Sequence, residues 1–295
     1  MTKIQRAYLE LHIAVLLFGF TAILGNLIQL SAIVLVWWRV LLACGVFIAF
    51  GKIFSKIRLL PKKLIWQYIA IGGLVALHWL AFYAAIKLSN ASVALICLAT
   101  TSFLSAILEP LMTRQPIKKH EIALGIVIIP AMVFVAGSLP SSMTAGLVVG
   151  LMSAVFVVVF SILNKKLITR ADPLSISLLE LGGALVFLTL LLPFFFKIEP
   201  TAAFLPSPTD WIYLLVLAVL CTNVAYLLAT RTLRHLSAFA TNLTINLEPV
   251  YGIMLAVVIL KENKQLSAAF YIGAAVILAA VLSYPFLDSR FGKKQ

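Results

Sequence analysis

The chain has 295 residues, of which 63% are hydrophobic and only 11% are charged, and its formal net charge at pH 7 is +13. Soluble domains carry about 25% charged residues, so the composition excludes an ordinary soluble protein and indicates a polytopic, all-α membrane protein. The apolar runs are continuous rather than alternating with period two, which excludes a transmembrane β-barrel. The positive charge lies at the ends of these runs and forms no single basic face, which argues against nucleic-acid binding.

Ten apolar spans follow one another along the chain, and each is long enough to cross a bilayer as a helix. The breaks between them are short, as at Asp172-Pro173, where an N-cap followed by proline predicts the start of a helix. The first span has no convincing small-x-small cleavage site, so we expect an uncleaved helix rather than a signal peptide. The expected spans cover residues 8–26, 31–51, 65–85, 91–112, 121–137, 144–163, 174–196, 211–230, 237–260 and 267–287.

The distribution of lysine and arginine predicts the orientation of these spans. With the N-terminus in the cytoplasm, 18 of these residues fall in cytoplasmic segments, four fall in external loops, and Arg39 lies within a span. Cytoplasmic loops of membrane proteins are enriched in Lys and Arg, so this orientation is the expected one. An even number of spans then places both termini in the cytoplasm.

The two halves of the chain are expected to be inverted repeats. Residues 86–133 and 234–281 share a span–connector–span layout without gaps when they are shifted by 148 residues. Five spans per half is an odd number, so the second half must enter the membrane in the opposite direction. The expected repeats are residues 1–138 and 143–288. Inverted repeats are typical of secondary transporters, which bind their substrate near the bilayer midplane.

Three stretches resemble the EamA-type drug/metabolite transporters: FGFTAILGNLI in the first span, VWWRVLLA in the second, and LEPVYGIMLAVVILKENKQLSAAFYIGAAVILAAVL in the last two. The resemblance covers essentially the whole chain and is most specific where Glu248-Pro249 is followed by the connector with Glu262. Two departures are Phe18, where relatives often have tryptophan, and Arg114, which stands where the second half has Glu262. The resemblance implies a ten-helix protein of a bacterial inner membrane that transports small metabolites, often by export.

Two charged residues lie inside spans, where each must find a partner or a water-filled cavity. Arg39 either attracts an anionic group of the substrate, such as a carboxylate, or it snorkels or pairs with a backbone carbonyl for structural reasons. Glu180 either couples a proton to gating or makes structural hydrogen bonds. The repeat places these residues at mirrored depths, roughly 10 Å apart along the membrane normal, so a direct salt bridge between them is not expected.

Polar residues recur at helical spacing in the ninth span. Asn242 and Asn246 are four residues apart, and Glu248 belongs to an adjacent ridge. Pro249 removes the amide that would bond the carbonyl of Ile245, which leaves an acceptor for substrate or water. These residues either form the wall of a central cavity or make interhelical hydrogen bonds around a static kink.

The third and eighth spans carry a second set of candidates. His78 and Phe82 share a helical face, with Trp79 beside them. In the repeat alignment His78 is equivalent to Tyr226, which lies near Asn223. A histidine and aromatic side chains facing a cavity suit an amphipathic metabolite, and a histidine there titrates near neutral pH. The alternative is a hydrogen-bonded packing histidine surrounded by core aromatics.

Other features of the spans point to packing. Pro130 is expected to bend the fifth span, and Gly72-Gly73 and Gly182-Gly183 permit close helix packing or hinging. The three cysteines lie within separate spans and form no CxxC, so we expect small packing residues rather than a disulfide or a metal site.

The sequence favours a secondary transporter of small polar or amphipathic metabolites, such as amino acids, with export as the expected direction. No nucleotide-binding loop is present, so transport is expected to be proton-coupled or to be facilitated exchange. An enzyme is not expected, because the sequence contains no HExxH and its three aspartates all lie in loops or at a span end. A lipid or lipid-linked-precursor flippase, and a sugar or nucleotide-sugar transporter, remain alternatives on the same scaffold.

The expected partners follow from this function. They are the small-molecule substrate, protons if transport is coupled, and membrane lipids. No cofactor and no nucleic acid is expected, and the sequence leaves open whether the protein forms a homodimer.

Overall fold

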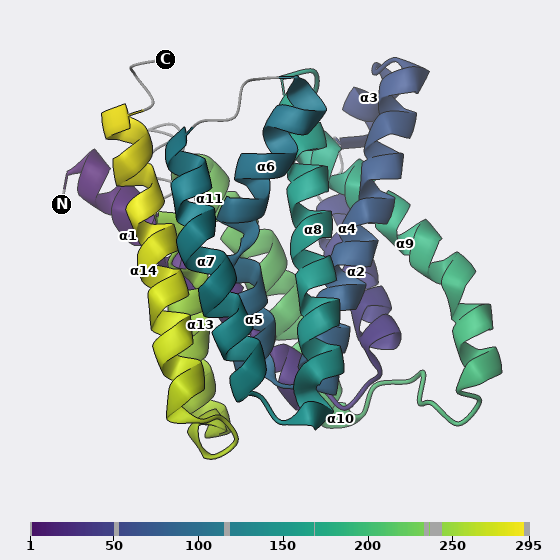
Figure 1. The fold of residues 1–295 in the computed structure, drawn as a ribbon. Coiled ribbons are helices and arrows are strands. Elements are labelled where there is room, and N and C mark those ends of the chain that lie inside the picture. The colour runs from purple at the N-terminus through teal and green to yellow at the C-terminus, as the bar shows by residue number, and fades with distance from the viewer. Residues whose placement is uncertain are drawn as a thin grey trace.

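The computed structural model describes residues 2–49, 53–114, 119–167, 169–232, 236 and 244–291. This part of the chain forms a bundle of helices that stand side by side, and it contains no strand (Figure 1). The α-helices are α1 (Lys3–Leu27), α2 (Ala32–Ala49), α3 (Ile53–Arg58), α4 (Lys62–Leu88), α5 (Ala91–Ala99), α6 (Thr101–Thr113), α7 (Lys119–Ser138), α8 (Thr144–Leu167), α9 (Pro173–Ile198), α10 (Pro208–Leu215), α11 (Ala225–Thr232), α13 (Glu248–Leu255) and α14 (Ala268–Phe291). Two π-helical segments, η2 (Val216–Val224) and η3 (Ala256–Leu260), continue α10 and α13, and short 3₁₀ turns are η1 (Ser141–Met143) and η4 (Glu262–Lys264).

The helices confirm the all-α membrane fold with ten spans. Six helical segments are each long and apolar enough to cross a bilayer alone, and α5 with α6 forms a further, broken span that bends by 40°. Three shorter apolar helices, 125–138, 248–260 and 268–283, stand where the fifth, ninth and tenth spans were expected. The break at Thr100 was not predicted, because its hydroxyl bonds the Cys97 carbonyl locally and leaves no break in hydropathy.

The second half of the bundle is inverted relative to the first. Helix α1 begins and α14 ends on one face, called here the terminal face, whereas α8 begins on the opposite, distal face (Figure 1). The halves are interleaved rather than separate, because α4 packs against α8 and α9, and α1 packs against α11 and α13. At the terminal face, Asp172 caps α9 by accepting a hydrogen bond from the Ser175 amide, with Pro173 in the first turn, as predicted.

Glycines set the separation of α4 and α9, which belong to different halves. A Cβ atom at Gly72 would lie 2.1 Å from the backbone oxygen of Glu180, and one at Gly183 would lie 2.4 Å from the backbone oxygen of Ile69. The other member of each predicted pair is not constrained: Gly73 would meet nothing closer than 3.9 Å, and Gly182 would meet nothing within 4 Å. Backbone atoms cannot rotate away as side chains do, so only Gly72 and Gly183 bring the helices together.

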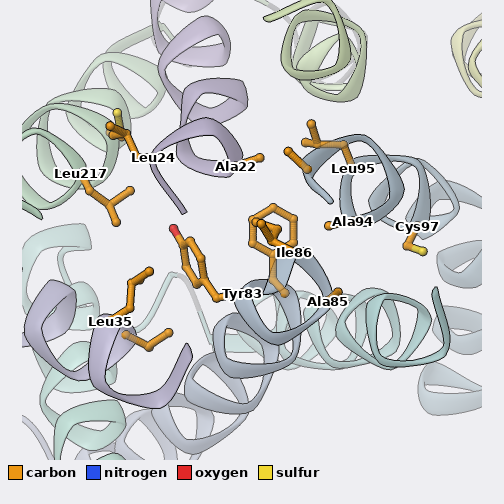
Figure 2. Close-up of a cluster of buried hydrophobic side chains, with 14 of the residues drawn as sticks. Ala22, Leu24, Leu35, Tyr83, Ala85, Ile86, Ala94, Leu95, Cys97 and Leu217 are labelled. Atoms are coloured by element: carbon orange, nitrogen blue, oxygen red, sulfur yellow. The ribbon is translucent and has the colours of Figure 1, made fainter. Parts of the chain in front are cut away.

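The distal half of the bundle is filled by a close-packed apolar core. Figure 2 shows the Tyr83 and Ile86 side chains of α4 between residues of α1, α2, α5 and η2, including Leu24, Leu35 and Leu217. Each of these positions lies near the distal end of its helix, and each is at most 2% exposed. The core therefore closes the bundle toward the distal face.

Buried carboxylates tie the connectors together at the distal face. Glu262 is 1% exposed, and its two carboxylate oxygens accept hydrogen bonds from the backbone amides of Ala91 and Ser92, each at 2.9 Å. These amides belong to the first turn of α5, where helical amides lack an intrahelical partner and favour a negative charge. The connector between η3 and α14 in the second half thus caps a helix of the first half.

A second tie joins the start of α10 to the connector between α1 and α2. Asp210 is 3% exposed, and it accepts a hydrogen bond from the Gln29 amide at 2.8 Å while it completes a capping box with Ser207. The Lys87 ammonium donates to the Ile28 carbonyl in the same connector. Together with Glu262, these bonds join both halves on the distal side.

The glycine contact predicts a position-specific loss of stability. We expect Gly72→Ala to lower the Tm of the purified protein by on the order of 5 °C, because the added methyl group forces α4 away from α9. Gly73→Ala is the matched control and is expected to leave the Tm nearly unchanged. Thermal unfolding in detergent measures both, and equal Tm values for the two variants would contradict this account of the crossing.

The Glu262 cap predicts a second loss of stability. Glu262→Gln replaces one carboxylate oxygen by an amide nitrogen, which is a donor and faces a backbone N–H donor. A buried hydrogen bond is therefore lost, which costs about 1–3 kcal/mol of stability. We expect the Tm to fall by several degrees, whereas Glu199→Gln, an exposed residue at the distal end of α9, leaves it unchanged. An unchanged Tm in Glu262→Gln would show that the cap contributes nothing to stability.

Candidate functional site

A cavity of about 440 Å³ lies between the two halves of the bundle. Its volume is typical of sites for small molecules, and its wall is mostly apolar and aromatic with a few polar groups. Helices of both halves contribute to this wall, as expected for a site at a repeat interface. The lining residues are Phe18, Thr21, Arg39, Phe47, Val75, His78, Trp79, Phe82, Leu98, Val157, Phe160, Asn164, Ile176, Ser177, Glu180, Leu181, Cys221, Thr222, Tyr226, Ile245 and Glu248.

The cavity lies in the middle of the bundle, and its walls in α8 and α9 reach toward the terminal face. Helix α8 runs from the distal to the terminal face, and its lining residues Val157, Phe160 and Asn164 all lie in its second half. Helix α9 runs the other way, and its lining residues lie between 176 and 181, in its first third. The distal side is occupied by the apolar core of Figure 2.

Arg39 is 4% exposed and is held by side chains that carry no charge. Its Nε donates to Thr222 Oγ1 at 3.1 Å, and its Nη1 donates to the Tyr83 hydroxyl at 2.8 Å. The guanidinium carbon lies 4.1 Å from the centroid of the Trp79 ring. These contacts replace the water that an arginine loses on burial. Arg39 and Glu180 are both among the described residues, and they form no ion pair with each other.

His78 lies in the cavity wall with one ring nitrogen already engaged. Its Nδ1 is 2.8 Å from Ser153 Oγ and 3.1 Å from the Ser153 carbonyl oxygen, and Ser153 Oγ donates to the His78 carbonyl at 2.9 Å. Because the hydroxyl proton of Ser153 is used in that bond, Nδ1 must carry the ring proton. The neutral ring then has Nε2 as an acceptor. The ring lies 6.2 Å from Phe82 and 5.8 Å from Phe160, measured between centroids.

Glu180 and Asn164 form a polar pair in the wall between α9 and α8. Asn164 is hydrogen-bonded to the Glu180 carboxylate. Glu180 Oε1 and Asn164 Oδ1 are both buried and have no hydrogen-bond partner. Sequence reasoning missed Asn164, because it lies one residue beyond the expected sixth span and beside Lys165 and Lys166, where it resembled loop sequence.

The other predicted residues divide into two groups. Trp79, Phe82, Tyr226 and Glu248 line the cavity, as Arg39, His78 and Glu180 do. Asn223 does not, because its amide nitrogen donates to the Ala43 carbonyl at 3.3 Å. Asn246 is half-buried outside the wall, and Asn242 lies outside the described residues.

The prolines have different local settings. Pro130 lies inside α7. Pro249 stands in the first turn of α13. This helix begins at Glu248, directly after a turn of two residues that separates it from residues 244–245. Pro249 therefore occupies a helix start, where its missing amide leaves no broken bond.

Several lining residues carried no individual signal in the sequence. Phe18, Thr21, Phe47 and Phe160 are apolar or small residues within apolar spans, and helical spacing alone does not separate a cavity face from a packed face. Thr222 was missed for the same reason, although it bonds Arg39. Their role depends on which helix faces meet, which the tertiary structure decides.

Comparison with known proteins agrees with the fold. A family model described as "EamA-like transporter family" matches residues 5–137 and again residues 144–284. A solved structure described as "Crystal structure of protein" superposes with a TM-score of 0.64 at 18% sequence identity and covers 97% of this chain and 98% of that chain, which supports the fold alone. No curated protein sequence matches the chain. Because the family model matches twice and spans nearly all of the sequence, the chain belongs to the EamA-like transporter family.

Proposed function

We propose that this membrane transporter is a secondary exporter of small amphipathic metabolites, such as amino acids, across a bacterial cytoplasmic membrane. The observation that carries the proposal is the single wall that both inverted halves build around the cavity, with Arg39, Glu180 and Glu248 set among aromatic side chains. Rocking of inverted halves around such a site exposes it to each side of the membrane in turn. An apolar wall with a few charged groups suits an amphipathic substrate.

We infer the direction of transport from the orientation of the chain and the position of the cavity. Described Lys and Arg residues gather in connectors of the terminal face, as in α3 and at the end of α8, which supports a cytoplasmic terminal face with both termini inside. The α8 and α9 walls of the cavity reach toward that face, whereas apolar core residues and buried ties lie on the distal side. This arrangement supports loading of the substrate from the cytoplasm and its export.

The charges of the wall disfavour a nucleotide-sugar substrate. Among the described lining residues, Arg39 is the only lysine or arginine, and its guanidinium is already bonded to Thr222 and Tyr83. A diphosphate needs several cations or oriented amides, as in other phosphate sites. A small metabolite with at most one negative group fits this wall better.

Export predicts a metabolite signature that depends on Arg39. Cells that overproduce the protein are expected to accumulate in the medium one class of carboxylated metabolite that also carries an amine, such as an amino acid. Arg39→Ala is expected to reduce this accumulation by about tenfold, since a charge-assisted hydrogen bond is lost. Arg39→Lys keeps the positive charge, so this variant separates a role of the residue in substrate binding from a role in folding. Arg58→Ala, which changes an exposed residue of α3, is the control. Equal accumulation with Arg39→Ala would exclude a substrate role for this residue. No accumulation with any variant would count against export itself.

Proton coupling predicts a response to a pH gradient. We propose Glu180 and Glu248 as the proton carriers, because both carboxyl groups line the cavity. In proteoliposomes loaded with the exported metabolite, an imposed pH gradient is expected to accelerate transport several-fold, and nigericin, which collapses the gradient, is expected to abolish the acceleration. A rate independent of the gradient would indicate facilitated exchange.

A further inference from the structure

Two buried acceptors in the cavity wall lack a donor. Glu180 Oε1 and Asn164 Oδ1 have no hydrogen-bond partner, although the two side chains are bonded to each other. A buried acceptor without a donor costs about 1–3 kcal/mol, and such groups in native proteins are rare. Both residues line the cavity, so this part of its wall is a candidate place for a donor.

Among the described residues, no donor is hydrogen-bonded to these two atoms. Arg39, the cation of the wall, is directed to Thr222 and Tyr83 and stacks on Trp79. His78 uses its Nδ1 proton on Ser153. The described wall holds two carboxyl groups and one guanidinium, so the carboxyl groups outnumber the cation. A ligand that brings both N–H donors and a positive charge complements this wall.

Aromatic rings lie next to the paired acceptors. Phe160 and Asn164 are four residues apart on α8, so they share a helical face, and the Phe160 ring lies 5.8 Å from the His78 ring. The Phe82 ring lies 6.2 Å from the His78 ring, measured between centroids. A ligand whose charged end meets Glu180 and Asn164 therefore places its next few atoms among aromatic side chains.

We propose that Glu180 and Asn164 form the subsite for a protonated amine of the transported substrate, and that the cavity prefers arylalkylamines to aryl carboxylates. The inference rests on the proposed function, because it assumes that the cavity is the transport site. It adds the group of the substrate that the wall recognises. An ammonium donates up to three hydrogen bonds and satisfies both orphan acceptors in one contact.

A matched series of ligands tests the subsite. The purified protein in lipid nanodiscs at neutral pH is titrated with 2-phenylethylamine, 3-phenylpropionate and 2-phenylethanol, and binding is measured by calorimetry. We expect the amine to bind roughly tenfold more tightly than the acid or the alcohol, since a charge-assisted hydrogen bond contributes more than 1 kcal/mol. Glu180→Gln is expected to remove this preference while binding of the alcohol stays unchanged, and Asn164→Leu is expected to reduce it several-fold.

Glu109→Gln is the control, because this carboxylate pairs with Lys165 at the terminal face and does not line the cavity. The Tm of each variant shows that the fold is retained. Equal affinities for the amine and the acid overturn the inference. Amine binding that Glu180→Gln leaves unchanged also overturns it, and this is the result expected if a proton occupies the carboxylate. In both cases export, measured by the metabolites in the medium, still stands. If none of the three ligands binds, the subsite is overturned, and the export measurement decides the proposed function separately.

Discussion

Inside a bilayer, every polar group of this chain must find its partner within the protein, and this constraint accounts for most of the bundle's particular features. Arg39 on α2 donates hydrogen bonds to Thr222 on η2 and to Tyr83 on α4, so its burial depends on the packing of α2 against η2 and α4. Glu262 serves the amides of α5 in the same way. Among the described residues, the buried side-chain atoms without a hydrogen-bond partner include Glu180 Oε1 and Asn164 Oδ1 of two cavity-lining residues.

The two faces of the bundle are built differently. On the distal side, apolar side chains around Tyr83 pack closely, and carboxylates join the connectors of both halves. On the terminal side, the wall of the cavity is aromatic and polar, and α4 and α9 touch through Gly72 and Gly183. Inverted halves of nearly equal length thus carry unequal packing at their two ends.

Residues that stand out by their free-energy cost were predictable as cavity residues. Arg39 and Glu180 are charges in apolar runs, and Glu248 stands beside a proline, so each drew attention without any knowledge of the fold. Asn223 and Asn246 drew the same attention, yet the former bonds a backbone carbonyl and neither lines the wall. A polar residue inside a span has two ways to be satisfied, and sequence alone does not distinguish them.

The sequence by itself determined the fold class, the ten spans and the inversion of the halves, because hydropathy and charge act on each segment separately and are summed along the chain. Only the tertiary structure decided which faces meet. Asn164 looked like loop sequence until α8 placed it against Glu180, and Gly72 was indistinguishable from Gly73 until α9 came within contact of one of them. Such contacts join residues far apart in the chain, and their geometry depends on helix rotation and crossing, which leave no mark on local composition.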